Sequence, residues 1–164
     1  AFLNYTSPFV TSRAQVNCVY FDLSKAFDNI HHNLLLRKLE YYSLGPTLNE
    51  WFGSYLASRK NYVRIGNVFS EPFISLSSVP QGSVLGPLLL LLFINDAIEC
   101  TKLGDELLFA DDIKLSFRIR CTEDCVALQA DITSVAKWCS TNHLCLNEQK
   151  TKVIVFTSET AIAL

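Results

Sequence analysis

Two adjacent carboxylates, Asp111 and Asp112, are the residues of this chain whose type and spacing best suit chemistry. An apolar run, 107–110, precedes them, and residues 113–119 then alternate between apolar and polar, as in a half-buried strand. The pattern predicts a β-hairpin with its turn at the two aspartates. Asp is a common turn residue, so the turn alone could explain the pair. A tight hairpin prefers Asp-Gly or Asn-Gly, however, and two like charges side by side become useful when a cation binds between them. This stretch alone leaves both explanations open.

A third carboxylate, Asp22, lies near the end of segment 16–23, which is short, rich in β-branched and aromatic residues, and typical of a buried strand. A sheet that contained this strand and the hairpin could bring all three carboxylates to one edge. Mg²⁺ prefers carboxylate and phosphate oxygens, and two-metal sites activate an attacking oxygen and stabilise a leaving one in phosphoryl transfer. The three carboxylates therefore indicate the chemistry of polymerases and nucleases. The loop VPQGS, 79–83, adds a glycine that permits close backbone approach.

The elements that must position these residues follow in the order strand, two helices, two strands, helix, hairpin, helix and strand, which is an α+β fold. The expected helices are 33–45, capped by Asn33, then 46–59, a buried apolar helix from 84, and an amphipathic helix over 123–141. The expected strands besides 16–23 and the hairpin are 61–66, 71–79 and 151–157. The apolar run 84–94 falls short of the roughly 20 residues that span a bilayer.

Composition fits one globular domain: 164 residues, 49% apolar, with a formal net charge of −2. The chain has no methionine and starts with Ala, so we interpret it as a segment of a longer protein, and its beginning does not resemble a signal peptide. Nucleic-acid-binding domains are usually strongly basic. If this chain holds nucleic acid, much of the affinity must come from other parts of the protein, and the isolated segment should bind it poorly.

The cysteines and one histidine suggest a zinc site that the helical pattern argues against. The spacing C-x3-C-x13-C-x3-H is close to that of a zinc finger, and its residues are Cys121, Cys125, Cys139 and His143. On the expected helix, Cys125 and Cys139 share one apolar face but lie roughly 21 Å apart at 1.5 Å per residue, too far to share one ion. Buried, reduced thiols fit better and indicate an intracellular protein.

Four segments resemble, in order, the motifs of a reverse transcriptase, in particular the polymerase of non-LTR (LINE-type) retrotransposons. VYFDLSKAFDNIHHNLLLRKL resembles the first palm motif, VPQGSVLGPLLLLLFINDAI the second, FADDIKL the paired-Asp box, and LCLNEQKTKVIVF the motif after it. The resemblance runs from about Val16 to Phe156. The box has Phe109 where the family usually has Tyr, a loss of one hydroxyl that should not abolish metal binding.

The resemblance implies a catalytic set. Asp22, Asp111 and Asp112 would hold two Mg²⁺ ions, for which Mn²⁺ can substitute. Lys150 matches a lysine proposed to protonate pyrophosphate as it leaves, although a solvated surface lysine explains that position nearly as well.

The resemblance also implies a set of substrate-binding residues. Phe27, five residues after Asp22, matches the aromatic ring beneath the incoming sugar, which would clash with a 2′-hydroxyl and favour deoxynucleotides. Gln81 and Gly82 match the loop that lies against the nascent base pair. Asp28 and His32 also match family positions, but we expect them to make local hydrogen bonds.

The fold that the resemblance implies is a polymerase palm, an antiparallel sheet backed by helices, with partial fingers and no thumb. Residues 1–15 would end an upstream fingers segment, 16–164 would form the palm core, and 30–78 would be a partial fingers insertion. The implied partners are an RNA template, a DNA primer, dNTPs, and the endonuclease, fingers and thumb regions of the parent chain, with no membrane. By family, the protein would be found in nuclear and cytoplasmic ribonucleoprotein, and the isolated fragment would be inactive.

Two other functions stay open on the sequence. An RNA-templated RNA polymerase shares the palm and the paired Asp, although Phe27 and the VPQG loop speak against it. A catalytically dead or domesticated retroelement copy could act as a binding domain, although the survival of all three carboxylates argues for catalysis.

Overall fold

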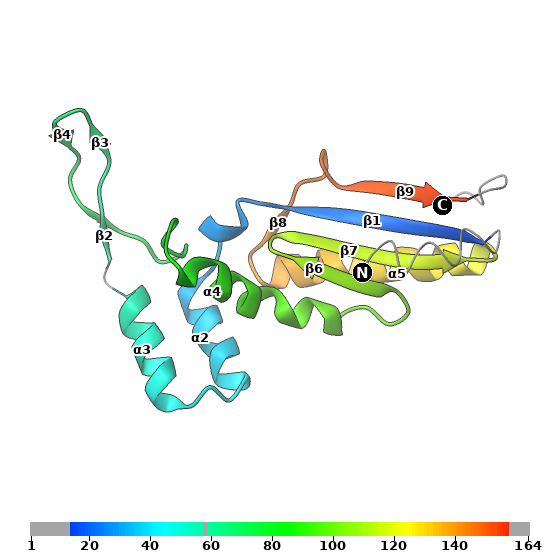
Figure 1. The fold of residues 1–164 in the computed structure, drawn as a ribbon, viewed down its shortest axis with the longest axis horizontal. Coiled ribbons are helices and arrows are strands. Elements are labelled where there is room, and N and C mark those ends of the chain that lie inside the picture. The colour runs from blue at the N-terminus through cyan, green and yellow to red at the C-terminus, as the bar shows by residue number, and fades with distance from the viewer. Residues whose placement is uncertain (1–13, 58, 158–164) are drawn as a thin grey trace. The chain divides into compact units, whose positions relative to one another are not determined.

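The computed structural model describes residues 14–57 and 59–157, which form two compact units. The sheet unit contains residues 14–24 and 95–157, and the helical unit contains residues 25–57 and 59–94 (Figure 1). Each unit is described by itself below. The expected fingers segment at 1–15 lies almost entirely outside the described residues.

The sheet unit is built on an antiparallel five-stranded sheet (Figure 1). Its central strand β1 pairs with β7 on one side and with β8 and β9 on the other, while β6 pairs only with β7. The strands are β1 (Gln15–Ser24), β6 (Asp105–Phe109), β7 (Asp112–Ile119), β8 (Cys145–Leu146) and β9 (Lys152–Phe156). The predicted α+β fold, the strand that carries Asp22, and a hairpin over this segment are confirmed. The turn was predicted at Asp111 and Asp112, but it is formed by Ala110 and Asp111, and Asp112 already pairs with Phe109 as the first residue of β7. The two-residue strand β8 was not predicted.

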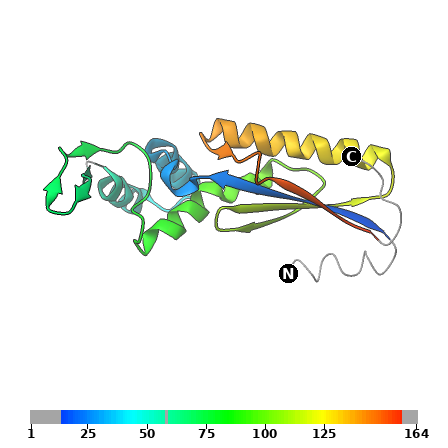
Figure 2. The same ribbon diagram turned by 90° about the horizontal axis from the view of Figure 1, so that it is seen from above.

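A long helix, α5 (Thr122–Thr141), lies along one face of this sheet (Figure 2). Its buried face contains Cys125, Leu128, Val135 and Cys139, as the 3-4 spacing predicts. Burial raises the pKa of the Cys139 thiol to about 12, so this group is an unreactive core residue at neutral pH.

The register assigns every strand residue to one of the two faces, because residues directly opposite each other on neighbouring strands point the same way. Glu106 is the partner of Leu115, and the field of Asp131 on α5 contributes to a raised pKa of Glu106, after burial as the main cause. Leu115 is fully buried, and we assign it and Glu106 to the face that α5 covers. The other face carries Asp22 and Asp112, and we call it the carboxylate face.

The helical unit contains a short 3-10 turn, three helices and a hairpin (Figure 1). The helical elements are η1 (Ala26–Asp28), α2 (His32–Tyr41), α3 (Pro46–Leu56) and α4 (Leu85–Ile94). The hairpin pairs β2 (Lys60–Asn61) with β5 (Phe73–Ile74), and β3 (Arg64–Ile65) with β4 (Val68–Phe69), around the turn at Gly66 and Asn67. It confirms the two predicted strand-like runs, although the paired stretches are shorter than expected.

The core of the helical unit lies among α2, α3 and α4, and its fully buried side chains include Leu35, Leu39, Leu89 and Phe93. The buried Lys38 donates a hydrogen bond of 2.6 Å from Nζ to the carbonyl of Phe93 near the end of α4, where helix carbonyls lack partners. The leucine-rich helix was predicted to be buried, and it is buried on one face only. Leu88 and Leu91, on the other face, are 46% and 45% exposed.

No helix among the described residues is long and apolar enough to cross a membrane. The leucine-rich helix α4 has ten residues.

Candidate active site

Two of the three predicted metal-binding carboxylates occupy directly opposed positions on neighbouring strands. Asp22 near the end of β1 is the register partner of Asp112 at the start of β7. Such cross-strand pairs have Cβ atoms about 5 Å apart, and like charges there repel. The apolar neighbours that hold the register, Phe21 and Ile113, are buried on the opposite face. The sheet therefore forces two carboxylates together at a position where a cation would relieve the repulsion.

The third carboxylate, Asp111, lies in the two-residue turn between β6 and β7. The residue before it, Ala110, has a φ of 53°. A two-residue hairpin loop needs positive φ at its first central position, where glycine is usual. Backbone strain of this kind tends to be kept at functional sites. The turn thus places Asp111 one residue from Asp112 at the same end of the sheet.

Lys150 lies beside this carboxylate pair. Its Nζ is 3.8 Å from Oδ2 of Asp22, and the two side chains are 69% and 32% exposed, so the ion pair is largely solvated. The chain is brought there by Asn147, whose N–H donates to the backbone carbonyl of Asp22 at 2.8 Å. A turn follows, in which the N–H groups of Lys150 and Thr151 both donate to the carbonyl of Asn147.

The residues fit a divalent metal by their chemistry and backbone placement. Carboxylates are the oxygen ligands that hard cations such as Mg²⁺ prefer, and Asp22, Asp111 and Asp112 supply three of them at one end of the sheet. Within the described part of the chain, however, no group of three or more His, Cys, Asp or Glu side chains is gathered closely enough to hold an ion. Metal binding would thus require the side chains to turn toward each other.

The predicted substrate-binding residues are gathered within the helical unit. Phe27, Gln81 and Gly82 line a cavity of about 500 Å³, together with Val84 and Pro87. Gly82 has a φ of +80°, a conformation that favours glycine, and no atom lies within 4 Å of where a Cβ would stand. The turn geometry alone therefore accounts for the glycine, while the open space beside it permits a ligand to approach.

Hydrogen bonds fix the loop that carries Gln81. Gln81 Nε2 donates to Oδ1 of Asp28 at 2.9 Å, and the N–H of Val79 donates to the carbonyl of Phe27 at 3.1 Å. His32 Nε2 lies 2.7 Å from the carbonyl oxygen of Ser78. Asp28 and His32 do make hydrogen bonds, but the expectation that these would be local was wrong, because the partners Gln81 and Ser78 are distant in the sequence. The bonds attach the loop 78–81 to η1 and α2.

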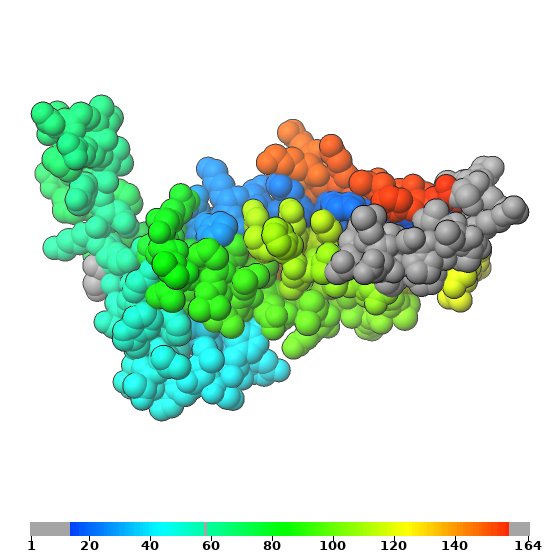
Figure 3. Space-filling view, in the orientation of Figure 1, coloured from blue at the N-terminus to red at the C-terminus, as the bar shows by residue number. Residues whose placement is uncertain are grey.

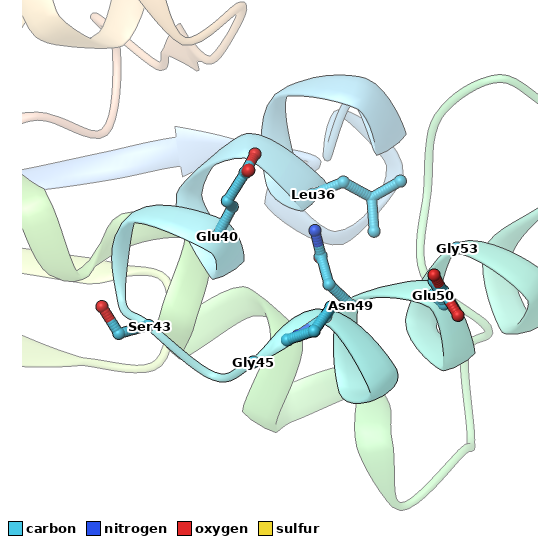
Figure 4. A pocket seen from close by; sticks show the side chains of 8 residues that line it. Leu36, Glu40, Ser43, Gly45, Asn49, Glu50 and Gly53 are labelled. Carbon is cyan, nitrogen blue, oxygen red and sulfur yellow. The ribbon is translucent and has the colours of Figure 1, made fainter.

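A second cavity of the helical unit, of about 610 Å³, lies between α2 and α3 (Figure 4). Glu40 and Asn49 extend into the space between the helices from opposite sides, with Leu36 beside them (Figure 4). None of the predicted site residues lines this cavity. It therefore adds nothing to the candidate active site.

Comparison with known proteins decides the family. Residues 10–161 match the sequence pattern of the family described as reverse transcriptase (RNA-dependent DNA polymerase). The chain belongs to the reverse transcriptase family. Members of this family bind an RNA template and nucleotides and generally use divalent metal ions.

Relatives of this reverse transcriptase chain come from insect transposons. It is 36% identical over 155 residues to the "Probable RNA-directed DNA polymerase from transposon BS" of Drosophila melanogaster, covering 88% of this chain and 17% of the relative. It is 31% identical over 154 residues to the corresponding X-element protein of the same species, covering 89% of this chain and 16% of the relative. The chain thus spans about a sixth of the length of these relatives. The resemblance to non-LTR retrotransposon polymerases is confirmed.

The fold of this reverse transcriptase chain is also found in telomerase. The structure of apo telomerase from Candida tropicalis, truncated from its C-terminal domain, matches with a TM-score of 0.66 at 14% identity, covering 97% of this chain and 35% of that one. At this identity the likeness concerns the fold alone. It confirms the predicted reverse transcriptase architecture of an antiparallel sheet with helices.

The structure adds residues that sequence reasoning missed. Asn147, which anchors the turn before Lys150, lies inside a segment whose resemblance to the family was noted without a role for the asparagine. Asp131, on α5, accepts three backbone hydrogen bonds. Its position in the sequence, one residue before the apolar Ile132, did not indicate that its carboxylate would be buried and hydrogen-bonded. The zinc interpretation gains no support, because the described residues contain no suitable group of ligands.

Proposed function

We propose that the protein containing this chain is an RNA-directed DNA polymerase. It transfers a nucleotide from a dNTP to the 3′-hydroxyl of a DNA primer on an RNA template. The observation that carries the proposal is the opposition of Asp22 and Asp112 across β1 and β7, with Asp111 in the adjoining turn, in a chain of the reverse transcriptase family.

The carboxylates would hold two Mg²⁺ ions, which when bound would help deprotonate the attacking hydroxyl and neutralise charge on the departing pyrophosphate. Asp22 and Asp112 are held by the sheet, so their backbones need not rearrange. Lys150, whose ammonium lies 3.8 Å from Asp22, would give a proton to the pyrophosphate as it leaves. Asn147 would act as a positioning residue for Lys150, through its bond to the Asp22 carbonyl.

Gln81, Gly82 and Phe27 would contact the incoming nucleotide. Their cavity is lined mainly by apolar groups, with the Gln81 amide and the Ser83 hydroxyl as its polar side chains and no cation, which suits a base and sugar better than a phosphate. The bond from Gln81 to Asp28 would hold that amide in place. We also propose that the full-length protein contains endonuclease, fingers and thumb regions. It would be found in nuclear and cytoplasmic ribonucleoprotein.

Primer extension with the longest reading frame that contains this chain tests the proposal. RNA and DNA templates of the same sequence are run in parallel, with Mg²⁺, with Mn²⁺ and after chelation. We expect synthesis on RNA that requires a divalent ion. A soluble, folded full-length protein that extends neither template would contradict the proposal and favour a dead or domesticated copy that acts as a binding domain.

Replacing Phe27 with alanine is expected to relax the choice of sugar. Removing the ring would remove its clash with a 2′-hydroxyl, and such steric selection is worth about 10- to 200-fold. We expect the preference for dNTP over NTP, measured as the ratio of kcat/KM values, to fall by a factor in that range. Leu48→Ala, at an exposed site on α3, serves as the control. An unchanged ratio in Phe27→Ala would leave Phe27 as a packing residue.

A further inference from the structure

The carboxylate face of the sheet carries a second row of polar residues beside the three aspartates. Tyr20 on β1 is the register partner of Lys114 on β7 and also of Lys152 on β9. All three side chains therefore point to one side, the side of Asp22 and Asp112, which lie two residues along the same strands. The Lys114 ammonium lies 5.1 Å from the centre of the Tyr20 ring, which agrees with this placement. We call Lys114, Tyr20 and Lys152 the basic row.

Charge is divided unequally between the two faces of the sheet. The strands of the described sheet contain three cationic residues, Lys114, Arg118 and Lys152, and the register places all of them on the carboxylate face. The face that α5 covers carries the apolar partners Leu115 and Val19 and the buried Glu106. The cations of the sheet strands are thus confined to the carboxylate face, where they lie among the carboxylates Asp22, Asp105 and Asp112.

We propose that the basic row binds the sugar–phosphate backbone of the primer–template duplex next to the primer end. The inference rests on the proposed function, and it assigns to Lys114, Tyr20 and Lys152 a binding role that the motif resemblance does not imply. These residues bind the nucleic acid and take no part in nucleotide transfer.

The spacing of the basic row suits a charged polymer. The backbones of Lys114 and Lys152 are separated by β1, which puts them roughly 10 Å apart, and the row lies roughly 7 Å along the strands from Asp22 and Asp112. Two flexible ammonium groups at that separation can reach phosphates along one strand or on both strands of a duplex. Tyr20 between them offers a ring and a hydroxyl, a residue type that contacts phosphate and sugar oxygens.

The side chains of the basic row are accessible to solvent, although the next pair on the same face, Cys18 and Ser116, is buried. Lys152 is exposed, and Tyr20 and Lys114 are half-buried. The strand β9, red in Figure 3, lies at the surface along the edge of the sheet. A strand of nucleic acid whose end lies at the three aspartates would continue over a neighbouring row, and the carboxylate face presents cations there.

The test is the salt dependence of binding. Full-length protein is titrated into a fluorescent RNA·DNA primer–template, without dNTP or divalent ions, over a series of KCl concentrations, and anisotropy gives Kd. Each phosphate contact contributes about 0.9 to the slope of log K against log salt. For Lys114→Gln/Lys152→Gln we expect the slope to fall by about 2 and Kd at low salt to rise roughly tenfold.

Two matched variants serve as controls. Lys102→Gln/Lys137→Gln removes the same charge from exposed sites in the loop bound by Asp131 and on α5, and should behave as the parent. Lys114→Arg/Lys152→Arg keeps the charge and should keep the slope, which excludes misfolding as the cause. Repeating the comparison in an Asp112→Asn background should give the same fall in slope if the lysines contact phosphate directly.

The outcomes separate the two proposals. If the protein synthesises DNA but Lys114→Gln/Lys152→Gln binds with the parent slope and Kd, the basic row is a solvated surface and this inference alone is wrong. A fall in slope equal to that of the Lys102→Gln/Lys137→Gln control also overturns it. If the parent protein binds no primer–template, both this inference and the proposed polymerase function fail.

Discussion

Replacing Asp112 with asparagine is expected to lower the rate of DNA synthesis on an RNA template by about a thousandfold or more, while leaving the metal-free fold intact. Asn keeps the shape of the side chain and removes the charge that a divalent ion needs. The same substitution removes the repulsion between Asp112 and Asp22, which face each other across β1 and β7. A cross-strand pair of like charges costs about 0.5 kcal/mol, so the metal-free variant should be slightly more stable than the parent.

This combination of lost activity and unchanged or raised stability is the signature of a metal-binding carboxylate. Primer extension gives the first quantity, and the melting temperature measured in chelator gives the second. Glu99→Gln, at an exposed site in the sheet unit, is the control and should change neither. Substantial synthesis by Asp112→Asn, or a loss of activity that tracks a loss of stability, would contradict a direct metal-binding role.

The largest expected effect on stability belongs to Asp131→Ala. The Asp131 carboxylate is 3% exposed and accepts hydrogen bonds from the backbone N–H groups of Lys102, Leu103 and Gly104 at 3.1, 3.2 and 3.1 Å. The substitution would leave three N–H groups without a partner at the base of strand β6. Allowing about 1 kcal/mol or more for each, we expect a local loss of about 3 kcal/mol.

Hydrogen exchange measures this loss where it occurs. A local cost of about 3 kcal/mol corresponds to a rise of about 100-fold in the exchange rate of amides in segment 102–105, since each 1.4 kcal/mol is about tenfold. Gln129→Ala, on the exposed side of α5, should leave exchange there unchanged. Exchange in Asp131→Ala as slow as in the parent would show that water or another group satisfies these amides.

The sequence was sufficient to predict the features that depend on local pattern. The alternation over 113–119 and the β-rich segment 16–23 became β7 and β1, and the 3-4 spacing of Cys125, Leu128 and Val135 became the buried face of α5. The opposition of Asp22 and Asp112 followed from these elements once both strands shared a sheet, because apolar alternation fixes which face each residue occupies.

Features that depend on contacts between distant segments could not be predicted. The approach of Lys150 to Asp22 depends on the bond from Asn147 N–H to the Asp22 carbonyl, and the three bonds to Asp131 join α5 to a loop nearly thirty positions earlier. Helix ends also moved. Asn33 was expected to cap this helix, but α2 begins at His32, so Asn33 lies in its first turn. The N-cap residue is His31, whose side chain makes no capping hydrogen bond.

The division of 16–164 into a palm core with a fingers insertion at 30–78 stays a prediction, as do the roles of Phe27, Gln81, Gly82 and Lys150. These roles depend on where a nucleotide binds. The hydrogen bonds that hold Gln81 and the ion pair of Lys150 support the placement of these side chains rather than their function.

A Mn²⁺ titration followed by electron paramagnetic resonance tests most directly whether Asp22, Asp111 and Asp112 hold divalent metal ions. The sample is the full-length protein with an RNA·DNA primer–template whose primer ends in a dideoxynucleotide, and a matching dNTP. We expect two tightly held Mn²⁺ ions per complex for the parent and for Glu99→Gln, and fewer for Asp22→Asn/Asp112→Asn. A parent complex that holds no more Mn²⁺ than the nucleotide and primer–template alone would contradict this expectation.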